Sequence, residues 1–167
     1  MKAPILRVDD RLVHGQVMAG WVAALALERL VLVNDAVAAD PFEREIYNSA
    51  VPPQLELVIL PVAGAVSTGM GMEERKAIWL VESLHDALAL VEQGLPVKSV
   101  NVGGVHAAAG RSEVLPFVWL SPSDRKICRQ LTGLGVHLEA RMLPSAEVHD
   151  LAALLAHERD SGVDEPA

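Results

Sequence analysis

The stretch RVDDRLVHGQV, residues 7–17, places two acidic side chains, two arginines, a histidine and a glycine directly after a short apolar run. The residues PILRV (4–8) have the length and apolar character of a β-strand. Helical spacing of apolar residues begins near Gln16. We therefore expect a strand, a loop over residues 9–15 that lies at the strand's carboxyl end, and then a helix.

The same alternation of strand and helix continues along the chain. Apolar runs of strand length recur, and most are separated by segments with helical spacing. The expected strands are 4–8, 29–35, 55–60, 76–81, 98–102, 115–120 and 136–143, and the expected helices are 16–27, 41–51, 83–94, 121–135 and 144–158. This order predicts a single-domain, three-layer α/β fold, in which helices cover both faces of a twisted, mostly parallel sheet of about seven strands.

Several element boundaries have a physical cause. Ser83, with Asp86 three residues later, predicts a helix start, and Gly94 predicts the end of that helix. Ser121 is expected to cap a helix that Pro122 begins. We expect one domain over residues 1–160, a polar tail over 161–167 and an irregular loop over 67–74.

Composition excludes several classes of protein. The chain of 167 residues has 14 basic and 22 acidic side chains, a net charge of -8 and only 4% aromatic residues, which argues against a nucleic-acid binder. No apolar run reaches the roughly 18 residues of a membrane span, and the opening residues do not resemble a signal peptide, so we expect a cytoplasmic protein. The single cysteine, Cys128, is expected to be structural.

His14 is the candidate nucleophile. A neutral imidazole attacks phosphorus near physiological pH, and the backbone amides of Gly15, Gln16 and Val17 at a helix start would stabilise an anion bonded to it. Either Asp9 or Asp10 could hold the other ring nitrogen, and Arg11 supplies donors suited to phosphate. The alternative is that His14 makes only a loop hydrogen bond while these charged side chains pair at the surface. Spacing alone leaves both interpretations open.

Other residues give weaker signals. Ser67 follows the third expected strand and could donate to a phosphate, although serine is an ordinary loop residue. The NVGG segment (101–104) lacks the G-x-G-x-x-G pattern of a dinucleotide site. His106 after it is more simply a solvated loop histidine, and Trp21 a core residue. The remaining histidines show no ligand spacing, so no metal site is expected; they are His85, His137, His149 and His157.

The stretch RVDDRLVHGQVMAGW (7–21) closely resembles the opening signature of the IIB subunit of the mannose/fructose/sorbose family of bacterial phosphotransferase systems. Three further segments resemble that family in the same order and at about the same spacing: VLVNDAVAAD (31–40), VEQGLPVKSVNVGG (91–104) and GVHLEARMLP (135–144). The resemblance therefore covers nearly the whole chain.

The resemblance implies a phosphocarrier whose fold is the one expected above. His14 matches the histidine that accepts a phosphoryl group from a IIA protein and passes it to a sugar held by the membrane subunits IIC and IID. Asp10 and Arg11 match the family's aspartate and arginine, which would orient the histidine and neutralise phosphate charge. The resemblance implies no cofactor, and it places the protein in the cytoplasm at the membrane permease.

Two other functions stay open. A regulatory phosphoprotein would be charged on His14 without phosphorylating a sugar, and a nucleotide-binding module would have no covalent chemistry there. The identity of the sugar and the formation of a homodimer are also open.

Overall fold

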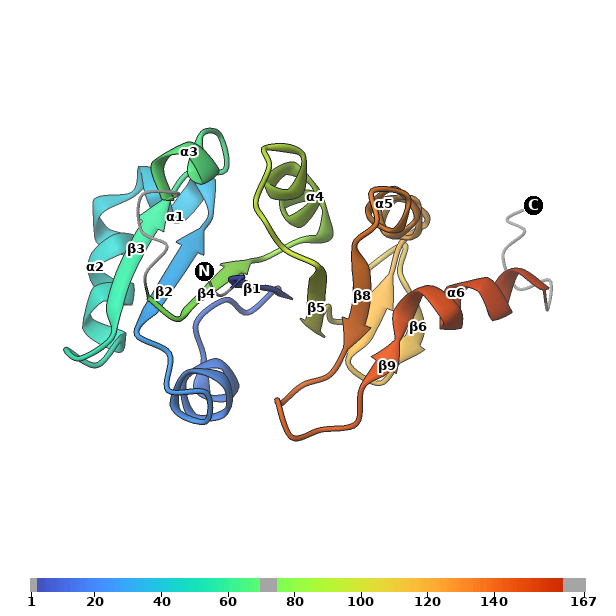
Figure 1. Ribbon diagram of the computed structural model, residues 1–167, viewed down its shortest axis with the longest axis horizontal. Helices are drawn as coiled ribbons and strands as arrows, with labels where there is room; N and C mark the ends of the chain where they lie inside the picture. The colour runs from blue at the N-terminus through green and yellow to red at the C-terminus, as the bar shows by residue number, and fades with distance from the viewer. Residues whose placement is uncertain (1–2, 70–74, 161–167) are drawn as a thin grey trace.

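The central strand of the molecule is β1 (Ile5–Asp9), which carries the signature loop at its carboxyl end. The computed structural model describes residues 3–69 and 75–160 (Figure 1). Six more strands complete the main sheet: β2 (Arg29–Val33), β3 (Glu56–Leu60), β4 (Ala77–Val81), β5 (Ser99–Gly104), β8 (His137–Ala140) and β9 (His149–Asp150). Their order is β3-β2-β4-β1-β5-β8-β9, so β1 is protected by three strands on each side.

All pairings in the main sheet are parallel except that between β8 and β9. The carboxyl ends of six strands therefore meet at one edge, and the loop after β1 lies in the middle of that edge. The predicted α/β fold with a mostly parallel sheet of about seven strands is confirmed.

Helices cover both faces of the sheet. One face packs against α3 (Ala65–Gly69), α4 (Leu84–Glu92), α5 (Pro122–Gly133) and α6 (Leu151–Asp160). The other face packs against η1 (Gln16–Ala23), α1 (Asp35–Ala39) and the partly buried side of α2 (Pro41–Ala50). Figure 1 shows α4 and α5 above the sheet and η1, the blue helix after β1, below it. Odd-numbered residues of β1 point toward η1, because neighbouring side chains on a strand alternate between faces.

Residues 115–120 do not form one strand, so that prediction is wrong. A turn at Pro116 and Phe117 separates β6 (Ser112–Leu115) from β7 (Val118–Leu120), and these two strands pair antiparallel in a sheet of their own. Proline cannot donate a ladder hydrogen bond, which explains the interruption. The hairpin is attached just past β5, where Trp119 N donates to Val105 O at 2.7 Å.

Three other boundaries differ from the prediction, two of them because polar side chains cap helices there. The expected strand over 29–35 ends at Val33, since Asn34 Oδ1 accepts from Val37 N and starts α1. The expected helix over 144–158 starts only at Leu151, and Asp150 Oδ1 accepts from Ala153 N. The expected helix over 16–27 is a π-helix that ends at Ala23.

The predicted caps are confirmed. Ser83 Oγ accepts from Asp86 N at 3.1 Å, and Ser121 and Asp124 form a reciprocal capping box at the start of α5. The helix stop at Gly94 uses the positive φ, 93°, that glycine adopts easily. The expected tail over 161–167 and residues 70–74 of the expected loop lie outside the described residues.

Cys128 is expected to resist thiol reagents in the folded protein. Its side chain is buried in α5, and burial, followed by the neighbouring Asp124 carboxylate, raises its pKa to about 12. Because the thiolate is the reactive form, labelling at neutral pH should become fast only in denaturant. A colorimetric thiol titration with and without denaturant measures this, and rapid labelling of the native protein would contradict the buried placement.

Candidate active site

The loop after β1 is built on Asp9, the last residue of the strand. Leu12 N donates to Asp9 O at 2.9 Å, which closes a turn, and Arg11 N donates to Asp9 Oδ1 at 3.2 Å. Leu12 has φ of 56°, an unfavourable value for leucine, but its side chain is buried in the apolar cluster that also contains Val17 and Trp21 of η1. Burial of Leu12 thus holds the loop in a conformation that brings the next turn of chain back over Asp9.

His14 lies over Asp9 with a defined tautomer. Its Nε2 is 2.9 Å from Asp9 Oδ2, and because a carboxylate only accepts, this nitrogen carries the proton. Gln16 N donates to His14 Nδ1 at 3.4 Å. The lone pair of the imidazole is therefore on Nδ1, at the start of η1, and the side chain is 17% exposed. His14 thus presents a basic nitrogen toward the helix start and keeps its proton on the buried side.

Asp9 is fully buried and is paired with the equally buried Arg7. Arg7 Nη2 donates to Asp9 Oδ2 at 2.9 Å, and its Nη1 donates to Asn101 Oδ1 at 2.5 Å and to Arg141 O at 3.2 Å. Burial lowers the pKa of Arg7 and the adjacent Asp9 carboxylate opposes that effect. A side chain at Gly103 would collide with this guanidinium, because an added Cβ would lie 1.9 Å from Arg7 Cζ. Gly103 is therefore required by the packing of Arg7.

The polar chain continues beyond Arg7 across the sheet. Asn101 Nδ2 donates to Glu139 Oε1 at 3.2 Å, and Arg141 Nη2 lies 3.1 Å from the same oxygen.

The ring of Trp21 covers this chain. The Cζ atoms of Arg7 and Arg141 lie 4.9 and 5.3 Å from the ring centroid, and Trp21 Nε1 donates to Met142 O. The predicted core position of Trp21 is confirmed, and the ring also covers the buried charges. Side chains from β1, β5, β8 and η1 thus position the Asp9 carboxylate, which in turn binds His14.

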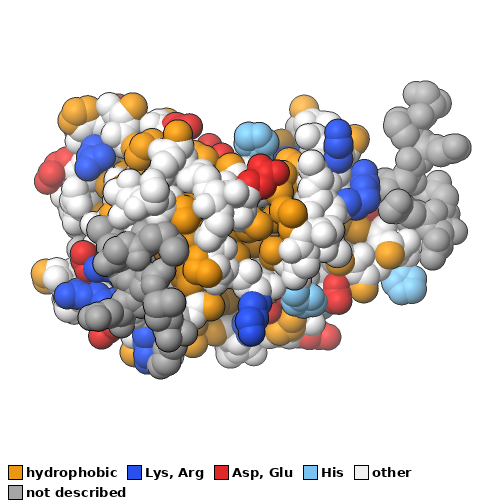
Figure 2. Space-filling view, turned by 45° about the horizontal axis from the view of Figure 1, so that its top comes forward, with side chains coloured by type: hydrophobic (Ala, Val, Ile, Leu, Met, Phe, Trp, Pro, Cys, Tyr) orange, Lys and Arg blue, Asp and Glu red, His pale blue; other side chains and the backbone are white. Residues whose placement is uncertain are grey.

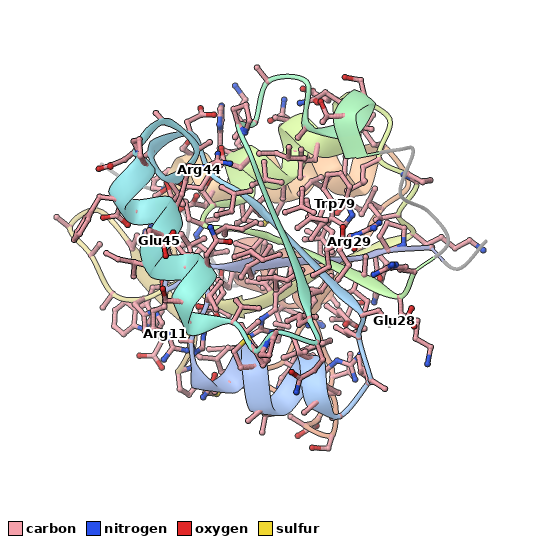
Figure 3. All side chains as sticks on the ribbon, turned by 90° about the vertical axis from the view of Figure 1, so that its left-hand side faces the viewer. Arg11, Glu28, Arg29, Arg44, Glu45 and Trp79 are labelled. Carbon is pink, nitrogen blue, oxygen red and sulfur yellow. The ribbon has the colours of Figure 1, made fainter. Side chains whose placement is uncertain are left out.

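Arg11 lies at the outer side of the loop. Its Nη2 donates to Gln16 Oε1 at 3.2 Å, its Nε is 3.5 Å from Asp9 Oδ1, and its side chain is 42% exposed. Figure 3 shows Arg11 on the opposite side of the molecule from Glu28 and Arg29, which lie at the amino end of β2. Arg11 is therefore at the carboxyl edge of the sheet, where its partly exposed guanidinium contacts Gln16 and Asp9.

Asp10 contacts a different histidine. Asp10 Oδ1 is 2.5 Å from His106 Nδ1, and its Oδ2 accepts from His106 N at 2.8 Å. Arg111 Nη1 donates to His106 O and is 3.7 Å from Asp10 Oδ2. Of the two aspartates that the sequence left open, Asp9 holds the imidazole of His14, while Asp10 holds His106, which the sequence treated as a solvated loop residue.

The remaining predicted positions separate into two groups. A Cβ at Gly15 would meet nothing within 4 Å, so there is open space for an approaching group at Gly15, whereas Val17 is fully buried and Gln16 is partly exposed. Ser67 is elsewhere: it lies in α3 after β3, and its Oγ donates to Gly64 O. Since β3 is three strands from β1, roughly 14 Å at the usual spacing, the structure does not bring Ser67 to His14.

Sequence reasoning missed Arg7, Asn101 and Glu139. One signal was present: Arg7 interrupts an otherwise apolar strand, and a charged residue in a central strand requires a buried partner. Its partner Asn101 is 94 positions away in the chain, so only the fold reveals the pair.

The surface and composition of the described residues give no sign of a metal or membrane-spanning element. No cluster of three candidate ligands is found in residues 3–69 and 75–160, and no helix within them is long and apolar enough to cross a bilayer. On the face in Figure 2, Lys and Arg side chains are spread among acidic and apolar ones rather than gathered in one stripe.

Comparison with known proteins gives a consistent result. The family model for the IIB component of sorbose-subfamily phosphotransferase (PTS) systems matches residues 3–165. The sorbose-specific EIIB component of Klebsiella pneumoniae is 33% identical over 147 residues, which are 87% of this chain and 90% of that protein. The fructose-specific EIIB component of Bacillus subtilis is 31% identical over 157 residues, 93% and 96% of the two chains.

A solved structure agrees over almost the whole chain. The IIBSor domain of the K. pneumoniae sorbose permease superimposes with a TM-score of 0.85 at 28% identity, covering 94% of this chain and 98% of that one.

Proposed function

Because the chain belongs to the sorbose subfamily of phosphotransferase-system IIB components, we propose that it is a phosphocarrier that accepts a phosphoryl group on Nδ1 of His14. The donor is a phosphohistidine on a IIA protein. The acceptor is a hydroxyl of a sugar of the mannose/fructose/sorbose class, held by the membrane subunits IIC and IID. This role places the protein in the cytoplasm, where it meets the permease at the membrane.

The observation that carries this proposal is the tautomer of His14. Asp9 accepts the Nε2 proton, so the lone pair on Nδ1 is available to attack phosphorus. In the transfer, the bond between phosphorus and the donor's histidine nitrogen breaks and a bond to Nδ1 forms, while the Nε2 proton stays in place. The phosphorylated ring then carries positive charge, which the Asp9 carboxylate stabilises at 2.9 Å.

Charge on the phosphoryl oxygens requires donors on the other side of the nucleophile. Arg11 is close to Gln16 and exposed, so its guanidinium can turn to the phosphoryl group. At the start of η1 the backbone amide of Gln16 lies beside Nδ1 and points at it. Positioning and electrostatics therefore account for transfer without a cofactor.

The test is the intact mass of the protein after incubation with phosphoenolpyruvate, the general phosphotransferase proteins and a cognate IIA. We expect the addition of one acid-labile phosphoryl group, which peptide mapping under alkaline conditions assigns to His14. Phosphorus NMR should assign it to Nδ1. A protein that stays unmodified beside a IIA shown to be charged would contradict the proposal, and phosphate on Nε2 would contradict its geometry.

A further inference from the structure

A second histidine–aspartate pair lies beside the first. His106 Nδ1 is 2.5 Å from Asp10 Oδ1, and the backbone N–H of His106 binds the other oxygen of the same carboxylate. The pair is placed by the backbone, since Asp10 N donates to Gly104 O at 2.9 Å. Arg111 fixes the loop from the far side by donating to His106 O. The ring of His106 is therefore held at Nδ1, and its backbone is held at both N and O, although it belongs to a loop.

The two pairs share one backbone position. A Cβ at Gly104 would lie 3.1 Å from Asp9 Oδ1 and 3.2 Å from His106 Cε1. The imidazole of His106 thus borders the carboxylate that holds His14. It lies on the outer rim, with 47% of its side chain exposed, whereas Asp9 is fully buried.

The two imidazoles present opposite nitrogens. Asp10 only accepts, so Nδ1 of His106 carries the proton and the lone pair is on Nε2. No hydrogen bond to this Nε2 is found within residues 3–69 and 75–160. A carboxylate that binds Nδ1–H and leaves Nε2 as a base is the arrangement of a histidine general base. His106 therefore has the orientation of a base and not that of the phosphate-carrying nucleophile.

We propose that His106, oriented by Asp10, is the general base for transfer of the phosphoryl group from His14 to a hydroxyl. The sugar oxygen attacks phosphorus, the bond between phosphorus and His14 Nδ1 breaks, the new phosphorus–oxygen bond forms, and the hydroxyl proton passes to His106 Nε2. His14 leaves with its Nε2 proton still on Asp9. This inference rests on the proposed function, because it concerns the second of its two transfers.

The two transfers differ in their need for a base. In the first, one histidine nitrogen replaces another at phosphorus and no proton is removed from the attacking atom. In the second, the attacking hydroxyl must lose its proton. In-line displacement also brings the hydroxyl from the side opposite Nδ1, toward the solvent rim. A base at the rim therefore serves the second transfer alone.

The experiment measures the rates of the two transfers separately in the His106→Gln variant. The rate of the first transfer is that of phosphorylation by a charged IIA, measured by rapid quench with radiolabelled phosphoenolpyruvate. The rate of the second transfer is that at which isolated phospho-protein loses its label to sugar on inverted vesicles that carry the cognate IIC and IID. Fructose, mannose and sorbose are offered separately, and Asp10→Asn is measured in the same way. His137→Ala, an exposed histidine at the amino end of β8, is the control.

We expect the second transfer to slow by roughly 10²-fold in His106→Gln, the lower end for general-base catalysis, while the first changes little by comparison. Equal slowing of both transfers would overturn the inference, because it would indicate a phosphate contact or a structural role. Wild-type protein that is charged but delivers to no sugar would also overturn it and would leave the carrier chemistry of His14 intact. Wild-type protein that is never charged would instead remove the proposed function itself.

Discussion

The His14→Ala protein is expected to take up no phosphoryl group from a charged IIA. The substitution removes the imidazole whose lone pair faces the start of η1, and a methyl group cannot form a bond to phosphorus. Asp9 keeps its ion pair with Arg7, so the free energy of unfolding should change by only about 1 kcal/mol. Radiolabelling and thermal melting measure the two effects on the same sample.

Two matched variants make this result specific. His85→Ala and His137→Ala each remove an exposed histidine outside the site, and both should be charged as the wild type is. If His14→Ala is labelled to the wild-type extent, the nucleophile must be another residue. A slight loss of stability in the variant would not change that conclusion.

Arg7→Met is expected to have the largest effect on stability. It leaves Asp9 without its only fully buried ion-pair partner among the described residues, and breaking a buried pair in this way costs about 3–5 kcal/mol. The measurement is the free energy of unfolding from urea titration. Phosphorylation at a temperature where the variant is still folded should also be slow, because the carboxylate that orients His14 is no longer held.

The double variant Arg7→Met, Asp9→Leu separates charge from packing. Replacing both members by apolar side chains should recover most of the lost stability, since neither charge is then buried. It should not recover phosphorylation, because the acceptor of the Nε2 proton is gone. Arg44→Met, on the exposed face of α2, is the surface control and should shift stability by about 0.5 kcal/mol at most. A loss below about 1 kcal/mol in Arg7→Met would show that the pair contributes little.

The order of strands and helices could be predicted from the sequence because each element carries its own signal. Apolar runs marked the strands of the parallel core, and Ser83 and Ser121 marked helix starts that depend only on residues three positions away. Predictions were less accurate where a polar side chain ended an element early, as Asn34 does after β2, or where a turn divided an apolar run, as Pro116 does.

The site could be predicted only in part. His14 and Arg11 belong to one local loop, so the sequence alone shows that they are neighbours. The separate tasks of Asp9 and Asp10 are not shown by the sequence, because β5 brings in two distant residues: His106, which binds Asp10, and Asn101, which binds the Arg7 partner of Asp9. Ser67 lies far from His14 because β2 and β4 separate β3, the strand before Ser67, from β1 in the sheet, and the sequence does not show that strand order.

The contrast between the buried chain from Asp9 to Glu139 and the exposed rim of Arg11 and His106 has a consequence for specificity. A carrier must present one nucleophile to two partners of different shape. Here the atoms that define the nucleophile are anchored in the middle of the sheet, out of reach of either partner. Exposed residues around Arg11 and His106 that take no part in the transfer can therefore diverge among carriers for different sugars, so that recognition changes while the chemistry of the histidine stays constant.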